Sequence, residues 1–72
     1  MAIEKVTLPV ARKIAGMTQK NLADAIHVSE STILKWEKGR SEPPVSKAIA
    51  IGEAVGIPYD DIIFLPQNTV KP

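Results

Sequence analysis

The connection between two consecutive helical patterns is the feature that most restricts how this 72-residue chain folds. Apolar residues recur at helical spacing over residues 18–26 and again over residues 29–38. Only two residues, His27 and Val28, join the two patterns. Such a short connection forces the second helix to cross the first at a steep angle. Ala23, in the middle of the first helix, is small enough to let the second approach closely.

The rest of the chain has the same helical period, and no stretch alternates with the period of two that is typical of a half-buried strand. We expect a first helix over residues 8–15, capped by Thr7 and ended by Gly16. A fourth helix is expected over residues 45–55, and a short fifth helix over residues 58–63, each opened by proline. The inward positions expected in the fourth helix are Ala48, Ile49, Ile51 and Val55. The sequence therefore predicts an all-α, compact five-helix domain without strands.

The composition argues against catalysis. The chain has no cysteine and a single histidine, so it lacks a thiol nucleophile and the residues of a common metal site. Asp60 and Asp61 are adjacent and point in different directions on a helix, and the four glycines are too dispersed to form a phosphate-binding loop. We therefore expect no enzyme activity, no catalytic residue, no metal, no cofactor and no small-molecule substrate.

The distribution of charge and apolar residues bears on partners and location. The net charge is only +1, but residues 1–41 carry seven basic and four acidic side chains, whereas residues 42–72 carry two and four. The basic half is suited to face an anion. No apolar run approaches the ~20 residues that span a bilayer, and the first seven residues lack the apolar stretch of a secretory signal. We expect a cytoplasmic protein with no membrane partner.

The third helix has two different faces when its residues are placed at about 100° per residue. Ile33, Trp36 and Glu37 fall on the side that packs. The opposite side carries Glu30, Ser31, Leu34, Lys35 and Lys38. Short polar groups, two lysines and one apolar side chain suit a helix that lies in the major groove of DNA, where side chains meet base edges and thymine methyls.

The run Thr18-Gln19, Leu22-Ala23, Ile26, Val28-Ser29, Thr32-Ile33 and Trp36-Glu37-Lys38-Gly39 resembles the helix-turn-helix of the lambda-repressor/Cro-like family, also called the XRE family. The likeness extends over most of the chain. It implies a lambda-repressor-like domain over residues 8–65, preceded by an N-terminal extension at residues 1–7 and followed by a flexible tail at residues 66–72.

The resemblance also implies a set of DNA-binding residues. Gln19 matches a glutamine that contacts a phosphate and supports the first residues of the recognition helix. The full set that matches the family is Gln19, Lys20, Glu30, Ser31, Thr32, Leu34, Lys35, Lys38, Arg40 and Ser41. Arg12 and Glu37 match a structural ion pair between the first and third helices.

Two residues depart from the family pattern. His27 stands where glycine is common in the tight turn, and histidine is among the residues that tolerate a left-handed backbone. Glu30 stands at a base-contact position, where a carboxylate can accept a hydrogen bond from cytosine N4 but repels phosphates. Glu30 therefore argues against strong, general affinity for DNA.

These features favour a sequence-specific transcriptional regulator of the phage Cro or repressor type, acting in a bacterial host cell. It is expected to bind a two-fold symmetric double-stranded DNA operator as a homodimer, with helix 29–38 in the major groove. The apolar segment 62–65 is the candidate dimer surface. The alternative is an anti-repressor that binds a partner repressor protein through the same helix-turn-helix surface, with Leu34 as the apolar anchor and Glu30 paired with basic residues.

Overall fold

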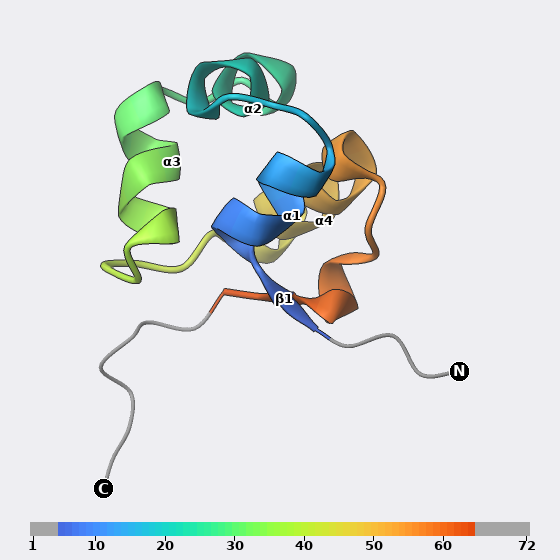
Figure 1. The fold of residues 1–72 in the computed structure, drawn as a ribbon. Helices are drawn as coiled ribbons and strands as arrows, with labels where there is room; N and C mark the ends of the chain where they lie inside the picture. Colours follow the sequence, from blue (N-terminus) through green and yellow to red (C-terminus); the bar gives the residue numbers. More distant parts are fainter. Residues whose placement is uncertain (1–4, 65–72) are drawn as a thin grey trace, which may run out of the picture.

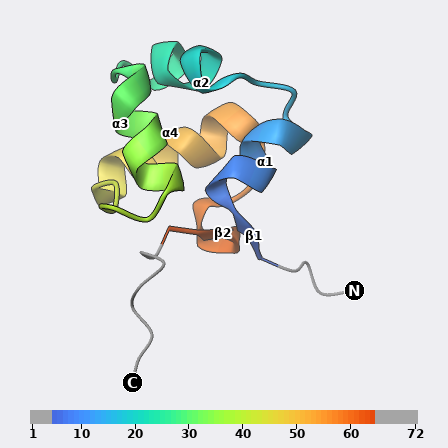
Figure 2. The same ribbon diagram turned by 60° about the vertical axis from the view of Figure 1, so that its left-hand side comes forward.

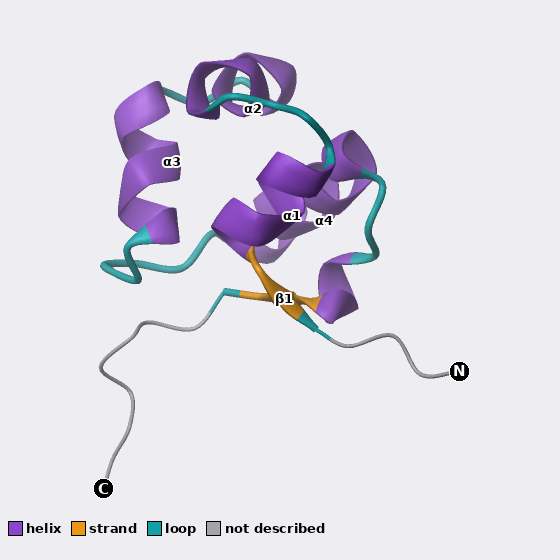
Figure 3. Cartoon of the chain, viewed as in Figure 1, coloured by secondary structure: helices purple, strands orange, loops and turns teal. Residues whose placement is uncertain are grey.

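The computed structural model describes residues 5–64, in which four α-helices surround a small core (Figure 1). The helices are α1 (Leu8–Ile14), α2 (Gln19–Ile26), α3 (Glu30–Glu37) and α4 (Val45–Val55). A short 3-10 helix, η1 (Tyr59–Asp61), follows them, and two strands, β1 (Val6–Thr7) and β2 (Ile62–Ile63), complete the described part (Figure 3). None of these helices is long and apolar enough to cross a membrane.

Side-chain caps start the two helices of the central motif. The Thr18 hydroxyl accepts a hydrogen bond from the Asn21 N–H at 2.9 Å, and the Asn21 side chain accepts one from the Thr18 N–H at 3.0 Å. At the start of α3, the Ser29 hydroxyl accepts from the Thr32 N–H at 3.2 Å. Each cap satisfies backbone donors that have no partner inside a first helical turn. Thr7 occupies the N-cap position of α1, but its side chain makes no cap hydrogen bond.

The turn between α2 and α3 depends on the backbone of His27. Its φ of 63° and ψ of 46° place it in the left-handed region, as the sequence led us to expect. It is the one non-glycine residue with positive φ in the part of the chain that the structure describes. This conformation ends α2 abruptly, and the chain then enters α3 at a steep angle to α2 (Figure 2).

Each of the four α-helices contributes one large, fully buried side chain to the core. These are Leu8, Leu22, Ile33 and Ile51. In Figure 2, α4 lies between α3 and α1, and it contacts both α1 and α2. The expected inward positions of α4 are confirmed except for Ile49, which is 40% exposed. Ile49 lies one turn after the exposed Val45, so both side chains lie on the outer face of α4.

The end of the described chain differs from the sequence prediction in two ways. The fifth element is a three-residue 3-10 helix, not an α-helix containing Ile62 and Ile63. These two isoleucines are extended and pair in parallel with β1, with Val6 opposite Ile62 and Thr7 opposite Ile63. The expectation of no strand was therefore wrong. Two-residue strands are too short to show an alternating pattern, and β-branched residues favour extended backbone.

Gly52 lets the segment after α4 fold back against the helix. A Cβ atom on Gly52 would lie 2.8 Å from the carbonyl oxygen of Ile57 and 2.9 Å from the backbone nitrogen of Tyr59. Both distances are shorter than real Cβ contacts, so only glycine allows this approach. The approach brings β2 beside β1. Val6 and Thr7, which the sequence analysis assigns to an N-terminal extension, therefore pair with β2 of the domain. Leu65 and the expected tail lie outside the described residues.

Candidate nucleic-acid interface

The two faces of α3 separate as the sequence predicted. Ile33 is fully buried and Trp36 is 8% exposed, so both belong to the core and Trp36 is not available to stack on a base. Ser31, Leu34, Lys35 and Lys38 are exposed on the other side. Leu34 keeps 39% of its surface accessible although it is apolar. We call Glu30, Ser31, Leu34, Lys35 and Lys38 the outward stripe.

The outward stripe lines two shallow depressions that meet at Ser31 and Leu34. One is lined by Ser31, Leu34, Lys35, Lys38 and Arg40. The other is lined by Gln19, Glu30, Ser31 and Leu34. The structure therefore brings seven of the ten predicted DNA-binding residues to one continuous surface. Lys20, Thr32 and Ser41 line neither depression.

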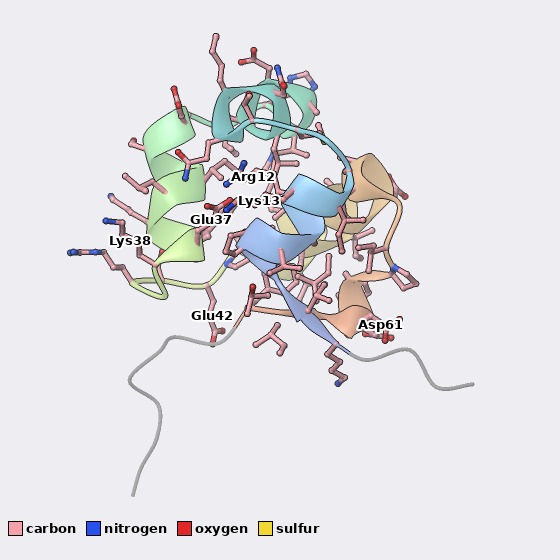
Figure 4. The ribbon with its side chains drawn as sticks, viewed as in Figure 1. Arg12, Lys13, Glu37, Lys38, Glu42 and Asp61 are labelled. Carbon is pink, nitrogen blue, oxygen red and sulfur yellow. The ribbon has the colours of Figure 1, made fainter. Side chains whose placement is uncertain are left out.

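The two depressions differ in charge. The first contains three cationic side chains, and the second contains the carboxylate of Glu30 and the amide of Gln19. Lys38 projects from the outer side of α3, away from the rest of the molecule (Figure 4). The surface thus has a basic end near the C-terminus of α3 and an acidic end near its N-terminus. A basic end of this kind suits phosphate contacts, whereas the acidic end does not.

A partly buried ion pair lies behind the stripe. Arg12 Nε is 2.6 Å from Glu37 Oε2, and Arg12 Nη2 donates to Glu37 Oε1 at 3.3 Å (Figure 4). The two side chains are only 12% and 6% exposed. Arg12 Nη1 also donates to the carbonyl oxygen of Met17 at 2.9 Å, just before α2. The ion pair expected from the sequence is present, and it joins α1, the α1–α2 turn and the end of α3.

Gln19 joins the same network. Its side-chain nitrogen donates to Glu37 Oε1 at 2.9 Å. The sequence placed the support from Gln19 at the first residues of α3, but the structure shows it at the last residue. This bond fixes the start of α2 against the end of α3. The phosphate contact of Gln19 stays a prediction.

The hydroxyl groups at the N-terminus of α3 bind one another. Ser29 Oγ lies 2.9 Å from the Thr32 hydroxyl and 3.1 Å from that of Ser31. Thr32 is half-buried, so its side chain serves the cap more directly than it serves an outside partner. Glu30 is exposed, and its carboxylate has no hydrogen-bond or ion-pair partner within residues 5–64.

Two further lysines have partners on the surface of the domain. Lys20 lies 3.4 Å from Asp24 one turn away, but both side chains are about two-thirds exposed, and such pairs contribute little. Lys20 therefore remains accessible. Lys47 of α4 donates to the carbonyl oxygen of Ile26 at 2.8 Å and so caps the end of α2. Sequence reasoning missed this contact because its partners are 21 positions apart and no local pattern marks them.

We also searched the described residues for a metal site. Among residues 5–64 there is no group of three or more His, Cys, Asp or Glu side chains placed to hold a metal ion. The described residues form a helix-turn-helix in which the inner side of α3 is buried and the outward stripe is exposed. This is the architecture of DNA-binding proteins that place the second helix of the motif in the major groove.

Comparison with known proteins agrees with this architecture. A family model described as helix-turn-helix matches residues 10–62. An uncharacterised HTH-type transcriptional regulator of Methanothermobacter thermautotrophicus is 38% identical over 61 residues, which is 83% of this chain and 88% of the relative. Another, from Methanocaldococcus jannaschii, is 34% identical over 64 residues, covering 89% of this chain and 97% of the relative. The chain therefore belongs to the helix-turn-helix family of XRE type.

Proposed function

We propose that this protein is a sequence-specific, DNA-binding transcriptional regulator of the Cro or repressor type, which inserts α3 into the major groove of an operator. The observation that carries the proposal is the exposed outward stripe on a helix whose other side is locked in the core. Ile33 and Trp36 hold α3 in place, while Leu34 and Lys35 project from it. The family membership supports the same function.

The proposed contacts divide into two kinds. Side chains at the N-terminal and middle parts of the stripe meet base edges: Glu30, Ser31, Leu34 and Lys35. Side chains at its basic end and on α2 meet phosphates: Lys38, Arg40, Ser41, Gln19 and Lys20. Phosphate contacts set the position of the protein on the duplex, and base contacts select the sequence.

A two-fold operator requires two copies of the domain, with one recognition helix in each half-site. Ile62, which belongs to the apolar segment 62–65, is 5% exposed and closes the core. Ile63 is 41% exposed and lies beside Tyr59 and Phe64 around an apolar depression. We propose that the exposed residues of this depression, which Lys5, Asp60 and the buried Ile62 also line, supply the contact between two copies.

Fluorescence anisotropy of a labelled duplex tests the DNA-binding function. The duplex contains the DNA that flanks the gene of this protein, and the titration is repeated at several salt concentrations. We expect affinity to fall steeply as salt rises, because each phosphate contact releases counterions. Affinity that does not depend on salt, or no binding at low salt, contradicts the proposal.

A second function rests on Leu34. An apolar side chain that is 39% exposed in a polar stripe suits a protein partner as well as a thymine methyl. In this alternative the protein is an anti-repressor, and Glu30 pairs with the basic DNA-reading residues of a repressor. Leu34→Ala is then expected to weaken the protein complex more than non-specific DNA binding, and Lys38→Ala the reverse. If neither variant changes either kind of binding, the outward stripe is not the functional surface.

A further inference from the structure

The carboxylate of Glu30 is the unusual group on the surface proposed to meet DNA. It is exposed, unpaired among the described residues, and lines the depression that it shares with Gln19, Ser31 and Leu34. Every other charged side chain around the two depressions is a cation. A carboxylate next to a phosphate backbone is repelled, so at this position it opposes DNA binding unless a base offers it a hydrogen-bond donor.

We infer that Glu30 is a specificity-determining residue that selects a cytosine in each half-site by accepting a hydrogen bond from its N4 amino group. This inference rests on the proposed DNA-binding function. Among the four bases, cytosine and adenine present an amino donor in the major groove, and carboxylates pair with the amino group of cytosine. Adenine places an acceptor, N7, beside its amino group, and this acceptor repels a carboxylate.

The position of Leu34 adds a second preferred base to the half-site. Leu34 lies one helical turn after Glu30, which is about 6 Å along the axis of α3. Base pairs are stacked about 3.4 Å apart, so the two side chains reach base pairs roughly two steps apart. Leu34 is the apolar member of the stripe and suits a thymine methyl. The preferred half-site is therefore one in which cytosine and thymine occur within about two steps of each other.

Glu30 also has a structural explanation that makes a different prediction. An acidic residue in the first turn of a helix interacts favourably with the helix dipole, and Glu30 is the acidic residue in the first turn of α3. If this were its only role, replacing the carboxylate would change stability slightly and leave base preference unchanged. A measurement of base preference therefore separates the two explanations.

Selection from a pool of duplexes with a randomised 20-base-pair segment, followed by sequencing, tests the inference. The wild-type protein, Glu30→Gln and Glu53→Gln are compared in parallel. Glu53→Gln removes the same charge from an exposed residue of α4 that lines neither depression, so it is the matched control. Thermal unfolding of all three proteins checks that they are folded.

We expect the wild type and Glu53→Gln to recover the same half-site, with cytosine favoured about tenfold at one position. Glu30→Gln is expected to lose this preference, and to favour adenine there because a glutamine amide pairs with adenine N6 and N7. It is also expected to bind random duplex more tightly than Glu53→Gln does. If Glu30→Gln recovers the wild-type half-site unchanged, the role of Glu30 is overturned while DNA binding stands. If the wild type enriches no half-site at all, both the inference and the proposed function fail.

Discussion

Glu30 and Glu37 stand at the two ends of α3 and have opposite environments. They are seven residues apart, so on a regular helix their side chains point within about 20° of each other. The side chain of Glu37 is 6% exposed and accepts three hydrogen bonds, two from Arg12 and one from Gln19. Glu30 is exposed and has no partner in residues 5–64.

The difference arises from what covers each end of the helix. Arg12 of α1 and Gln19 of α2 lie against the C-terminal end of α3. Glu30, at the other end, stays exposed among residues 5–64. The same residue type at nearly the same angle thus stabilises the fold at one end and is available to a partner at the other. Position on a helical wheel does not distinguish the two, but the neighbouring helices do.

The largest effect is expected at Glu37. Glu37→Ala leaves the guanidinium of Arg12, whose side chain is only 12% exposed, without its charge partner, so we expect the free energy of unfolding to fall by at most about 3–5 kcal/mol. Glu30→Ala removes only a helix-dipole interaction and is expected to cost less than about 1 kcal/mol. Urea unfolding of both variants measures the contrast.

A double variant sharpens this comparison. Replacing both charges, as in Arg12→Met with Glu37→Leu, is expected to recover much of the stability lost in Glu37→Ala, since no charge is then buried without a partner. Equal losses for Glu30→Ala and Glu37→Ala would show that the contrast between the two ends is wrong.

The next effect distinguishes the two faces of α3 at adjacent positions. Ile33→Ala removes a fully buried side chain and is expected to cost about 2–5 kcal/mol. Leu34→Ala truncates a partly exposed side chain and is expected to change stability by less than about 1 kcal/mol. Thermal and urea unfolding of this pair are the measurements, and a larger loss for Leu34→Ala would mean that the stripe faces the core.

A smaller effect is expected at the N-cap of α3. Ser29→Ala removes the acceptor for the Thr32 N–H and is expected to lower stability by about 1 kcal/mol. Ser41→Ala, at an exposed residue of the following loop, is the control and is expected to be nearly neutral. Denaturant unfolding distinguishes them, and equal values for the two variants would exclude a role for the cap in stability.

The smallest effect on stability is expected at Lys38. Lys38→Ala is expected to leave the free energy of unfolding within about 0.5 kcal/mol of the wild type. It is expected to weaken DNA binding at all sequences, and to reduce the slope of log affinity against log salt concentration by about the value of one phosphate contact. Lys13→Ala, at an exposed lysine of α1 outside the stripe, is the control. Anisotropy titrations across a salt series test this, and identical slopes for both variants and the wild type would remove Lys38 from the interface.

Much of the helix-turn-helix could be predicted from the sequence because its caps, its turn and its periodicity each depend on neighbouring residues. Thr18 and Ser29 cap their helices, His27 adopts the left-handed turn, and the periodicity separates Ile33 from Leu34. Each of these features depends on residues a few positions apart. The residues expected to meet DNA are likewise accessible or half-buried in the structure, but their contacts with DNA remain predictions.

The features that sequence reasoning missed depend on distant contacts. The two-residue pair of β1 and β2 joins positions 56 apart, and neither strand is long enough to show a pattern. The bond from Gln19 to Glu37 and that from Lys47 to Ile26 likewise span 18 and 21 positions. Ile49 was assigned inward because α4 is apolar on several sides, which leaves the periodicity ambiguous.

The outer face of α3 is the surface that we propose meets DNA. Titrating the isotopically labelled protein with duplex DNA and recording amide chemical-shift changes by NMR tests it most directly. We expect the largest changes at Ser31, Leu34, Lys35 and Lys38, with small changes at Val45 and Ile49 on the outer face of α4. Changes concentrated on α4, with α3 unaffected, would contradict it.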